Sequence, residues 1–195
     1  MKYLYIDTET TGLNPKTCAI HQLSGIVTAD GLTEEFNLIM APHDGAEISF
    51  SPHPYTDFVP PDPATFKDYP SQDDVYLEFK ELLKKYVDPF DTTDKFQIIG
   101  YNVQFDMDFL RQWFIRNGDD FIGSFFWFPP IDVMYLASIV LAGERHLLPN
   151  FRLSTVYEYV FPTDPKFDAH DALADIRATK KLLGALFNRL RSPTN

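Results

Sequence analysis

The chain has 195 residues, of which 45% are hydrophobic and 15% aromatic, so we expect a folded globular protein with a substantial core and exclude a disordered chain. Its formal net charge of −11 argues against a protein that coats duplex nucleic acid through a broad basic face, although bound divalent cations would reverse the field at a single site. The single cysteine excludes an internal disulfide, and neither a signal peptide nor a run of the roughly 20 apolar residues of a membrane span is found, so we expect a cytoplasmic protein.

The apolar run at residues 3–6 predicts a strand that is buried on both faces. Side chains two positions apart on a strand share a face, so Asp7 and Glu9 are expected to point the same way at the end of this strand. Two carboxylates about 7 Å apart repel each other unless a cation lies between them. A solvated pair of acids on a surface strand is the commoner explanation of an isolated Asp-x-Glu, so this pair alone decides nothing.

Residues 19–29 and 32–40 are two further extended segments, and the Asp30-Gly31 pair between them predicts a hairpin. Residues 41–70 form a proline- and aromatic-rich arm. So many prolines exclude a regular helix or a central strand there. The aromatic residues of the arm either stack on bases or belong to an irregular surface segment, and the sequence favours neither.

A helical pattern at residues 71–86 precedes a buried strand at 96–101. Asn102 is a good N-cap for the helix that follows, in which aromatic residues recur at every fourth position. Asp106 lies in the first turn of this helix, where the helix dipole favours a carboxylate even without a function. The carboxyl end of a strand in a βα unit is also where the sites of open α/β sheets gather.

Two prolines at 129–130 are predicted to break the chain before short helices at 131–141 and 153–160. The last helix follows His170 and contains Asp175. Residues five apart are separated by roughly 140° around a helix, so His170 must lie in the preceding loop or the first turn if both serve one site. A capping or surface role is the commoner explanation of a lone histidine.

Taken together, these acidic residues and the histidine match, in order and local context, the DEDD superfamily of 3'-5' exonucleases and its DEDDh (DnaQ-like) branch. Asp7-Thr8-Glu9-Thr10-Thr11-Gly12 resembles the first motif of the family, Asn102-x-x-Phe105-Asp106 the second, and His170-x-Ala172-x-x-Asp175 the third. A histidine before the final aspartate, in place of a tyrosine, is the mark of this branch. The resemblance implies an α/β fold, an RNase H-like mixed sheet of about five strands flanked by helices, and a single exonuclease domain over residues 1–195. The arm at 41–70 does not map onto the family.

The same resemblance implies a metal-dependent 3'-5' exonuclease, which releases nucleoside 5'-monophosphates from the 3' end of single-stranded DNA or RNA. Asp7, Glu9 and Asp175 would share one Mg²⁺ or Mn²⁺ ion, and Asp7 and Asp106 would help hold a second one. His170 would be the general base. The residues expected beside the substrate are Thr10, Thr11, Leu13, Asn102 and Phe105, although a cap role already explains Asn102 and helical spacing favours a core role for Phe105.

Two alternatives stay open: an RNA-specific 3' trimming exoribonuclease, and a nonenzymatic polymerase- or helicase-associated module that retains the fold. The partners we expect are the 3' end of a single strand and a polymerase or another DNA- or RNA-processing protein, without a membrane. The low basic content favours delivery by such a partner or a short-range grip on the substrate.

Overall fold

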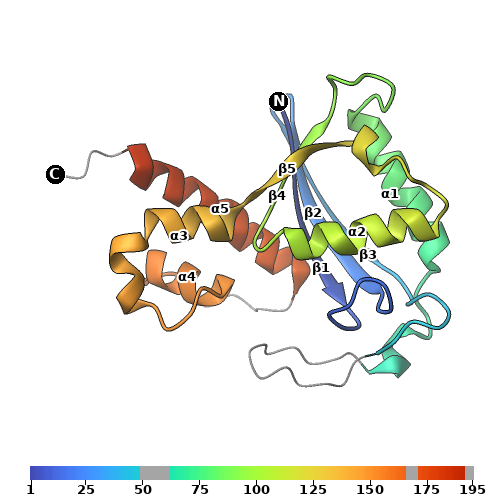
Figure 1. Ribbon diagram of the computed structural model, residues 1–195, viewed down its shortest axis with the longest axis horizontal. Coiled ribbons are helices and arrows are strands. Elements are labelled where there is room, and N and C mark those ends of the chain that lie inside the picture. Colours follow the sequence, from blue (N-terminus) through green and yellow to red (C-terminus); the bar gives the residue numbers. More distant parts are fainter. Residues whose placement is uncertain (49–61, 166–170, 192–195) are drawn as a thin grey trace.

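A mixed five-stranded sheet forms the centre of the computed structural model, which describes residues 1–48, 62–165 and 171–191 (Figure 1). The strands are β1 (Lys2–Thr10), β2 (Ile20–Ala29), β3 (Leu32–Ile39), β4 (Phe96–Gly100) and β5 (Phe126–Asp132), in the spatial order β3-β2-β1-β4-β5. β2 is antiparallel to β1 and β3, whereas β4 is parallel to β1 and β5 is parallel to β4. The predicted RNase H-like mixed sheet is therefore confirmed.

Helices cover both faces of this sheet. They are α1 (Gln72–Tyr86), α2 (Gln104–Arg116), α3 (Val133–Val140), α4 (Leu153–Val160) and α5 (Ala172–Arg191), with short 3-10 helices at Pro63–Phe66, Ile122–Ser124 and Ala142–Leu147. In Figure 1, α1 and α2 lie to the right of the sheet and α3, α4 and α5 to the left. Each layer of helices closes its own hydrophobic core against the sheet. No helix among the described residues is long and apolar enough to cross a membrane.

β1 is the central strand, and its side chains alternate between the two cores. Leu4 and Ile6 are fully buried in the core beneath α1 and α2. Tyr3 and Tyr5 pack into the other core, where the Lys180 Nζ of α5 lies 5.3 Å from the centroid of the Tyr5 ring. The period of two therefore directs the later odd-numbered residues of β1 toward α5 and the even-numbered ones toward α2.

Local sequence signals account for several of these elements. The predicted hairpin between β2 and β3 is confirmed: Asp30 and Gly31 have positive φ angles of 52° and 80°, as a two-residue turn of this kind requires. The helix predicted at 71–86 begins after Ser71, whose hydroxyl accepts a hydrogen bond from Asp74 N at 3.1 Å. The helix predicted at 153–160 is α4.

Two local expectations are wrong. Residues 129–130 do not break the chain but lie within β5. An edge strand pairs with a neighbour on one side only, so it needs fewer backbone N–H donors and tolerates proline. The register between β4 and β5 also shifts between Gln97 and Ile99, which accommodates the two prolines. Asn102 is not the N-cap of α2: Val103 holds that position, and Asn102 has a left-handed φ of 57°. Asparagine tolerates this conformation better than most residues, so the same residue type serves the turn before the helix instead.

The described part of the arm, residues 41–48 and 62–70, contains one short 3-10 helix, Pro63–Phe66, but neither an α-helix nor a strand. Ala41 N donates a hydrogen bond to Pro70 O at 2.8 Å, which joins the two ends of the arm. Residues 49–61 lie outside the described residues, and with them most of the aromatic side chains that raised the question of base stacking.

Candidate functional site

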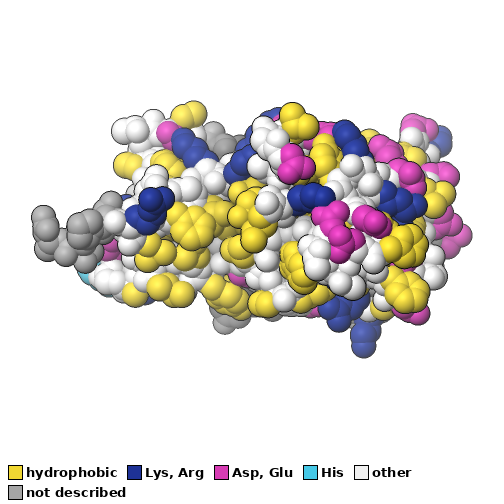
Figure 2. Space-filling view, turned by 90° about the horizontal axis from the view of Figure 1, so that it is seen from above, with side chains coloured by type: hydrophobic (Ala, Val, Ile, Leu, Met, Phe, Trp, Pro, Cys, Tyr) yellow, Lys and Arg dark blue, Asp and Glu magenta, His cyan; other side chains and the backbone are white. Residues whose placement is uncertain are grey.

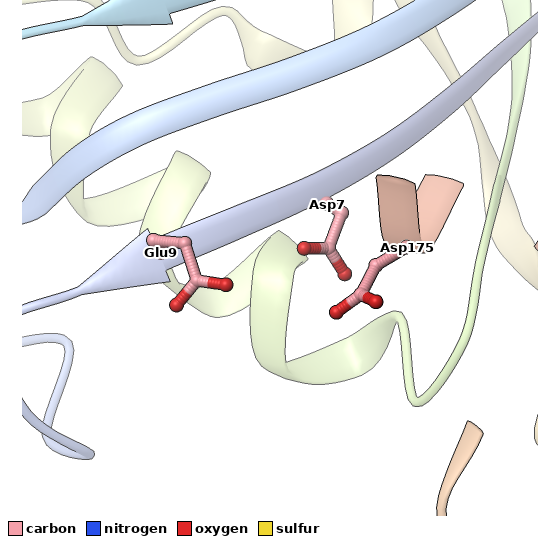
Figure 3. A group of neighbouring side chains, drawn as sticks. All are labelled: Asp7, Glu9 and Asp175. Carbon is pink, nitrogen blue, oxygen red and sulfur yellow. The ribbon is translucent and has the colours of Figure 1, made fainter. Parts of the chain in front are cut away.

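Three carboxylates meet where the central strand ends. Asp7 and Glu9 lie on the face of β1 that is turned toward α5, and Asp175 comes from the first turn of α5. One ligand atom from each of the three lies within 4.8 Å of the others. Figure 3 shows the three side chains on one side of β1, with Asp175 approaching from the helix. The structure thus brings together three of the four acids that the sequence singles out.

Asp106 reaches the same strand from the opposite face. It lies in the first turn of α2 and is only 3% exposed. Its Oδ1 accepts hydrogen bonds from Thr8 N at 2.9 Å and from Thr8 Oγ1 at 2.7 Å. Thr8 points away from its neighbours Asp7 and Glu9, and Asp106 lies close enough to Asp7 that its charge acts on Asp7 more strongly than that of Asp175 does.

Burial and mutual repulsion dominate the electrostatics of the site. Burial, and then the negative charges nearby, of which Asp106 is the strongest, hold the pKa of Asp7 well above its usual range. Burial, with the charges of Asp175 and Asp106, raises the pKa of Glu9 to about 8. Burial also raises the pKa of Asp106 to about 7, against the opposing effect of the hydrogen bonds from Thr8. A divalent cation would relieve this repulsion.

Asp132, which was not among the predicted site residues, is the N-cap of α3 and also fixes the turn between β4 and α2. Its Oδ1 accepts hydrogen bonds from Asn102 N at 3.1 Å and from Met134 N at 2.9 Å. It therefore ties the end of β5 and the start of α3 to the left-handed residue ahead of Asp106. Its charge also contributes to the raised pKa of Asp106. The contact between Asp132 and Asn102 could not be predicted from the sequence, because β5, the strand that brings Asp132 next to Asn102, was not predicted.

The loop after β1 is held from several directions. The Thr10 hydroxyl donates to Gly12 O at 2.7 Å, and the Thr11 hydroxyl donates to Glu47 O at 2.7 Å. Both threonines are buried, so their hydroxyls shape the loop. Leu13 is 43% exposed at the tip. Arg116, at the end of α2, donates to the carbonyl oxygens of residues 15 and 16 at 2.8 and 3.0 Å, which anchors the far side of the loop.

The remaining predicted residues are placed differently from one another. Phe105 is partly buried against the first core, and its ring centroid lies 4.9 Å from that of Phe109, so it packs as a core residue at the site's edge. His170 lies outside the described residues. Asp171, which was not predicted, comes directly before α5. Its carboxylate accepts hydrogen bonds from Leu173 N at 3.3 Å and Gln22 Nε2 at 3.4 Å, and its charge reaches Asp7 and Glu9.

The donor set is suited to a hard divalent cation. Carboxylate oxygens are the ligands that Mg²⁺ and Mn²⁺ prefer, and among the described residues this is the group of acidic, histidine or cysteine side chains with metal-binding spacing. The three carboxylates are partly buried, which weakens the competition from water, and their mutual repulsion raises the pKa of Glu9 and is relieved when a cation binds. The arrangement can therefore hold a cation between the end of β1 and the first turn of α5.

Comparisons with known proteins agree with this geometry. Residues 4–183 match the family model RNase_T, described as "Exonuclease". The chain is similar to a structure of exonuclease I said to suggest how processivity is achieved, with 23% identity and a TM-score of 0.68 over 96% of this chain and 41% of that one. It is also similar to Escherichia coli exonuclease I in complex with a dA16 oligonucleotide, with 22% identity and a TM-score of 0.66. A third similar structure is an exonuclease I/SSB-Ct complex, with 22% identity and a TM-score of 0.65. Both similarities cover 96% of this chain and 41% of the other. The chain spans less than half the length of these structures, and at these identities the likeness shows the fold. No curated protein matches the chain.

Proposed function

Because the chain belongs to the exonuclease family whose model matches residues 4–183, we propose that it is a metal-dependent 3'-5' exonuclease acting on single strands. The resemblance to DEDD-type exonucleases is confirmed by this family membership. In the proposed reaction, the enzyme hydrolyses the last phosphodiester bond at a 3' end and releases a nucleoside 5'-monophosphate. The observation that carries the proposal is the meeting of Asp7, Glu9 and Asp175 within 4.8 Å at the end of the central strand.

The metal requirement follows from the donor set. We propose that Asp7, Glu9 and Asp175 hold one Mg²⁺ or Mn²⁺ ion and that Asp7 and Asp106 help hold a second. Such a pair would supply an activated water and would stabilise the charge on the leaving 3' oxygen. Asp106 Oδ1 accepts both hydrogen bonds from Thr8, which fix the position of the side chain. The second carboxylate oxygen, Oδ2, would then be the atom that binds the metal ion.

The proton transfer is assigned to His170. Its place in the third motif, five residues before Asp175, supports this role, and an imidazole with an ordinary pKa of about 6.5 accepts a proton at neutral pH. The carboxylates of the site are less suited to that task, because they are needed in their charged form as ligands. The residue that takes the proton from water would then be a group that does not itself bind metal.

The substrate end is proposed to lie over the loop after β1. Leu13 offers an exposed apolar side chain for contact with the terminal base, and Thr10 and Thr11 hold the loop that carries it. Asn102 is exposed in the turn ahead of Asp106, where it can contact the strand, whereas Phe105 supports the turn from the core. We treat residues 1–195 as one exonuclease domain that contains all these parts.

Single-stranded DNA is the preferred substrate in this proposal. Its support is the similarity to exonuclease I structures, one of them bound to dA16. The similarity to an exonuclease I/SSB-Ct complex supports a DNA-processing protein as the partner that delivers substrate. RNA trimming is the competing substrate choice. A nonenzymatic module is disfavoured because the acids of all three motifs are present.

The test compares matched DNA and RNA strands. Oligonucleotides of equal sequence are incubated with the protein and Mg²⁺, Mn²⁺ or EDTA, and the products are separated by chromatography. The proposal predicts nucleoside 5'-monophosphates in either metal, none in EDTA, and faster release from DNA. Faster release from RNA would move the assignment to an exoribonuclease. Oligonucleotide products of internal cleavage, or no product from either polymer, would contradict the proposal.

A further inference from the structure

Two large aromatic side chains that are adjacent in the sequence are exposed on the edge of the sheet. β5 is the edge strand, and Trp127 and Phe128 on it are 39% and 45% exposed. Phe126 is buried in the core beneath α1 and α2, so alternation puts Phe128 on the α2 side of the sheet and Trp127 on the other. The two rings thus flank the open edge of β5.

A cationic side chain lies beside each of these two rings. Lys95 Nζ lies 5.4 Å from the centroid of the Trp127 ring, and the guanidinium carbon of Arg111 lies 5.7 Å from that of Phe128. Most other lysines and arginines with close contacts in the described chain pair with acids, but neither of these two forms an ion pair there. Lys95 Nζ donates a hydrogen bond to Gly123 O at 2.5 Å, but among the described residues no acid forms an ion pair with either cation, in a protein whose net charge is −11.

This pair of rings and cations, which we call the β5 edge patch (Lys95, Arg111, Trp127 and Phe128), is connected to the candidate site. Arg111 follows Asp106 by five residues on α2, a rise of about 7.5 Å along the helix. Phe128 precedes Asp132, the residue bonded to Asn102, by four positions, which is about 13 Å along a strand. The pairing of both Tyr3 and Trp127 with Gln97 places Trp127 level with Tyr3, about 13 Å along the sheet from Asp7, so a strand whose 3' end lies at the carboxylates meets the patch only beyond its first few nucleotides.

The chemistry of the patch favours a single strand of nucleic acid over another protein. Bases stack on exposed aromatic faces, and cations beside those faces meet the phosphates. Pairing with a further protein strand is opposed by Pro129 and Pro130, which lack the N–H groups that an edge ladder needs. Figure 2 shows one face of the molecule, on which acidic, basic and apolar side chains are intermingled and no continuous basic surface is seen.

From these observations we infer that the β5 edge patch is an accessory binding site for single-stranded nucleic acid, which holds nucleotides upstream of the 3' terminus. The inference rests on the proposed function, because it takes its orientation from the carboxylate site. It explains how an acidic chain gains affinity for a longer strand through two aromatic and two cationic side chains.

The test measures how affinity depends on strand length. Fluorescence anisotropy gives the Kd for oligo-dT of about 4 and about 16 nucleotides, the range of site sizes for single-strand binding folds, with metal chelated. We expect the wild type to bind the longer strand more tightly. Trp127→Ala and Phe128→Ala should each weaken binding of the longer strand about ten-fold and leave the shorter one unchanged. The double variant Lys95→Gln/Arg111→Gln should reduce the salt slope by about 1.4. Phe90→Ala, at a side chain that is 94% exposed and has no such cation, is the matched control.

The outcomes separate the patch from the proposed function. Retained melting temperature and retained hydrolysis of the short strand with Mg²⁺ show that a variant is folded and active. Equal losses for both lengths, no loss for the long strand, or a wild type that does not favour the longer strand would overturn the inference, even if both strands are degraded. Self-association of the wild type that the aromatic variants abolish, without any change in oligonucleotide binding, would assign the patch to a protein interface. If the wild type degrades neither strand with metal, the proposed function fails as well.

Discussion

Removing one carboxylate from the three-acid cluster is expected to change stability in opposite directions with and without metal. The substitution is Glu9→Gln, which keeps the shape of the side chain and removes its charge. With metal chelated, the variant should be more stable than the wild type, because less repulsion opposes folding. With excess Mg²⁺ the order should reverse, because the variant has lost a charged ligand.

The size of this effect follows from the geometry. Two unit charges 4.8 Å apart repel by about 3.5 kcal/mol at an effective dielectric constant of about 20, and the three carboxylates form such pairs. Removing the charge of Glu9 abolishes its repulsion with both Asp7 and Asp175. Proton uptake already relieves part of this repulsion, as the raised pKa of Glu9 indicates, so a net gain of about 1 to 3 kcal/mol is expected in chelator.

Thermal unfolding with EDTA and with Mg²⁺ measures both effects. A ligand at about 100 times its Kd stabilises the folded state by about 2.7 kcal/mol, which corresponds to about 5 to 10 °C for a chain of this size. Glu78→Gln, the same change at an exposed position on α1, is the control and should respond to metal as the wild type does. The reasoning is refuted if Mg²⁺ leaves the wild-type melting temperature unchanged, or if Glu9→Gln is less stable than the wild type in EDTA.

Three further predictions concern residues around the site. Burial lowers the pKa of His21 from 6.5 to about 4, so the folded state resists its protonation, and stability should fall by up to about 3 kcal/mol as pH drops through that window. Urea titrations at several pH values should show this fall in the wild type and lose it in His21→Phe; the same pH slope in both would contradict it. Asp132→Ala should lower kcat/KM at least about ten-fold by releasing Asn102, whereas Asp132→Asn, which keeps the accepting oxygen, should retain most activity. Equal activity in these two variants would remove Asp132 from the positioning of the turn. Arg116→Gln should raise KM several-fold with kcat nearly unchanged, because it loosens the loop that carries Leu13; a fall in kcat at constant KM would argue for a different role.

Much of the fold could be predicted because its signals are local. The apolar run before Asp7, the Asp30-Gly31 turn and the periodic helices each depend on a few neighbouring residues, and the structure has them where the pattern indicates. β5 could not be predicted in this way. Its prolines are compatible with a strand only because that strand lies at the edge, and the position of a strand in a sheet is set by tertiary packing.

The candidate site shows the same division. Period-two alternation correctly placed Asp7 and Glu9 on one face, and the family motifs pointed to Asp106 and Asp175. The hydrogen bonds that hold Asp106 against Thr8 depend on which helix covers which face of the sheet, which no single segment encodes. The role of Asp132 likewise depends on a pairing across 30 positions of sequence.

The central claim is tested most directly by digesting a 5'-labelled single-stranded DNA with the wild type and with Asp7→Asn. Asp30→Asn, at the exposed hairpin turn, is the matched control. With Mg²⁺ or Mn²⁺, the wild type and the control should shorten the strand from its 3' end in steps of one nucleotide, and Asp7→Asn should lose this activity. A ladder that persists in EDTA, that survives Asp7→Asn, or that starts from the 5' end would contradict the assignment of the carboxylate cluster as a metal-dependent 3'-5' exonuclease site.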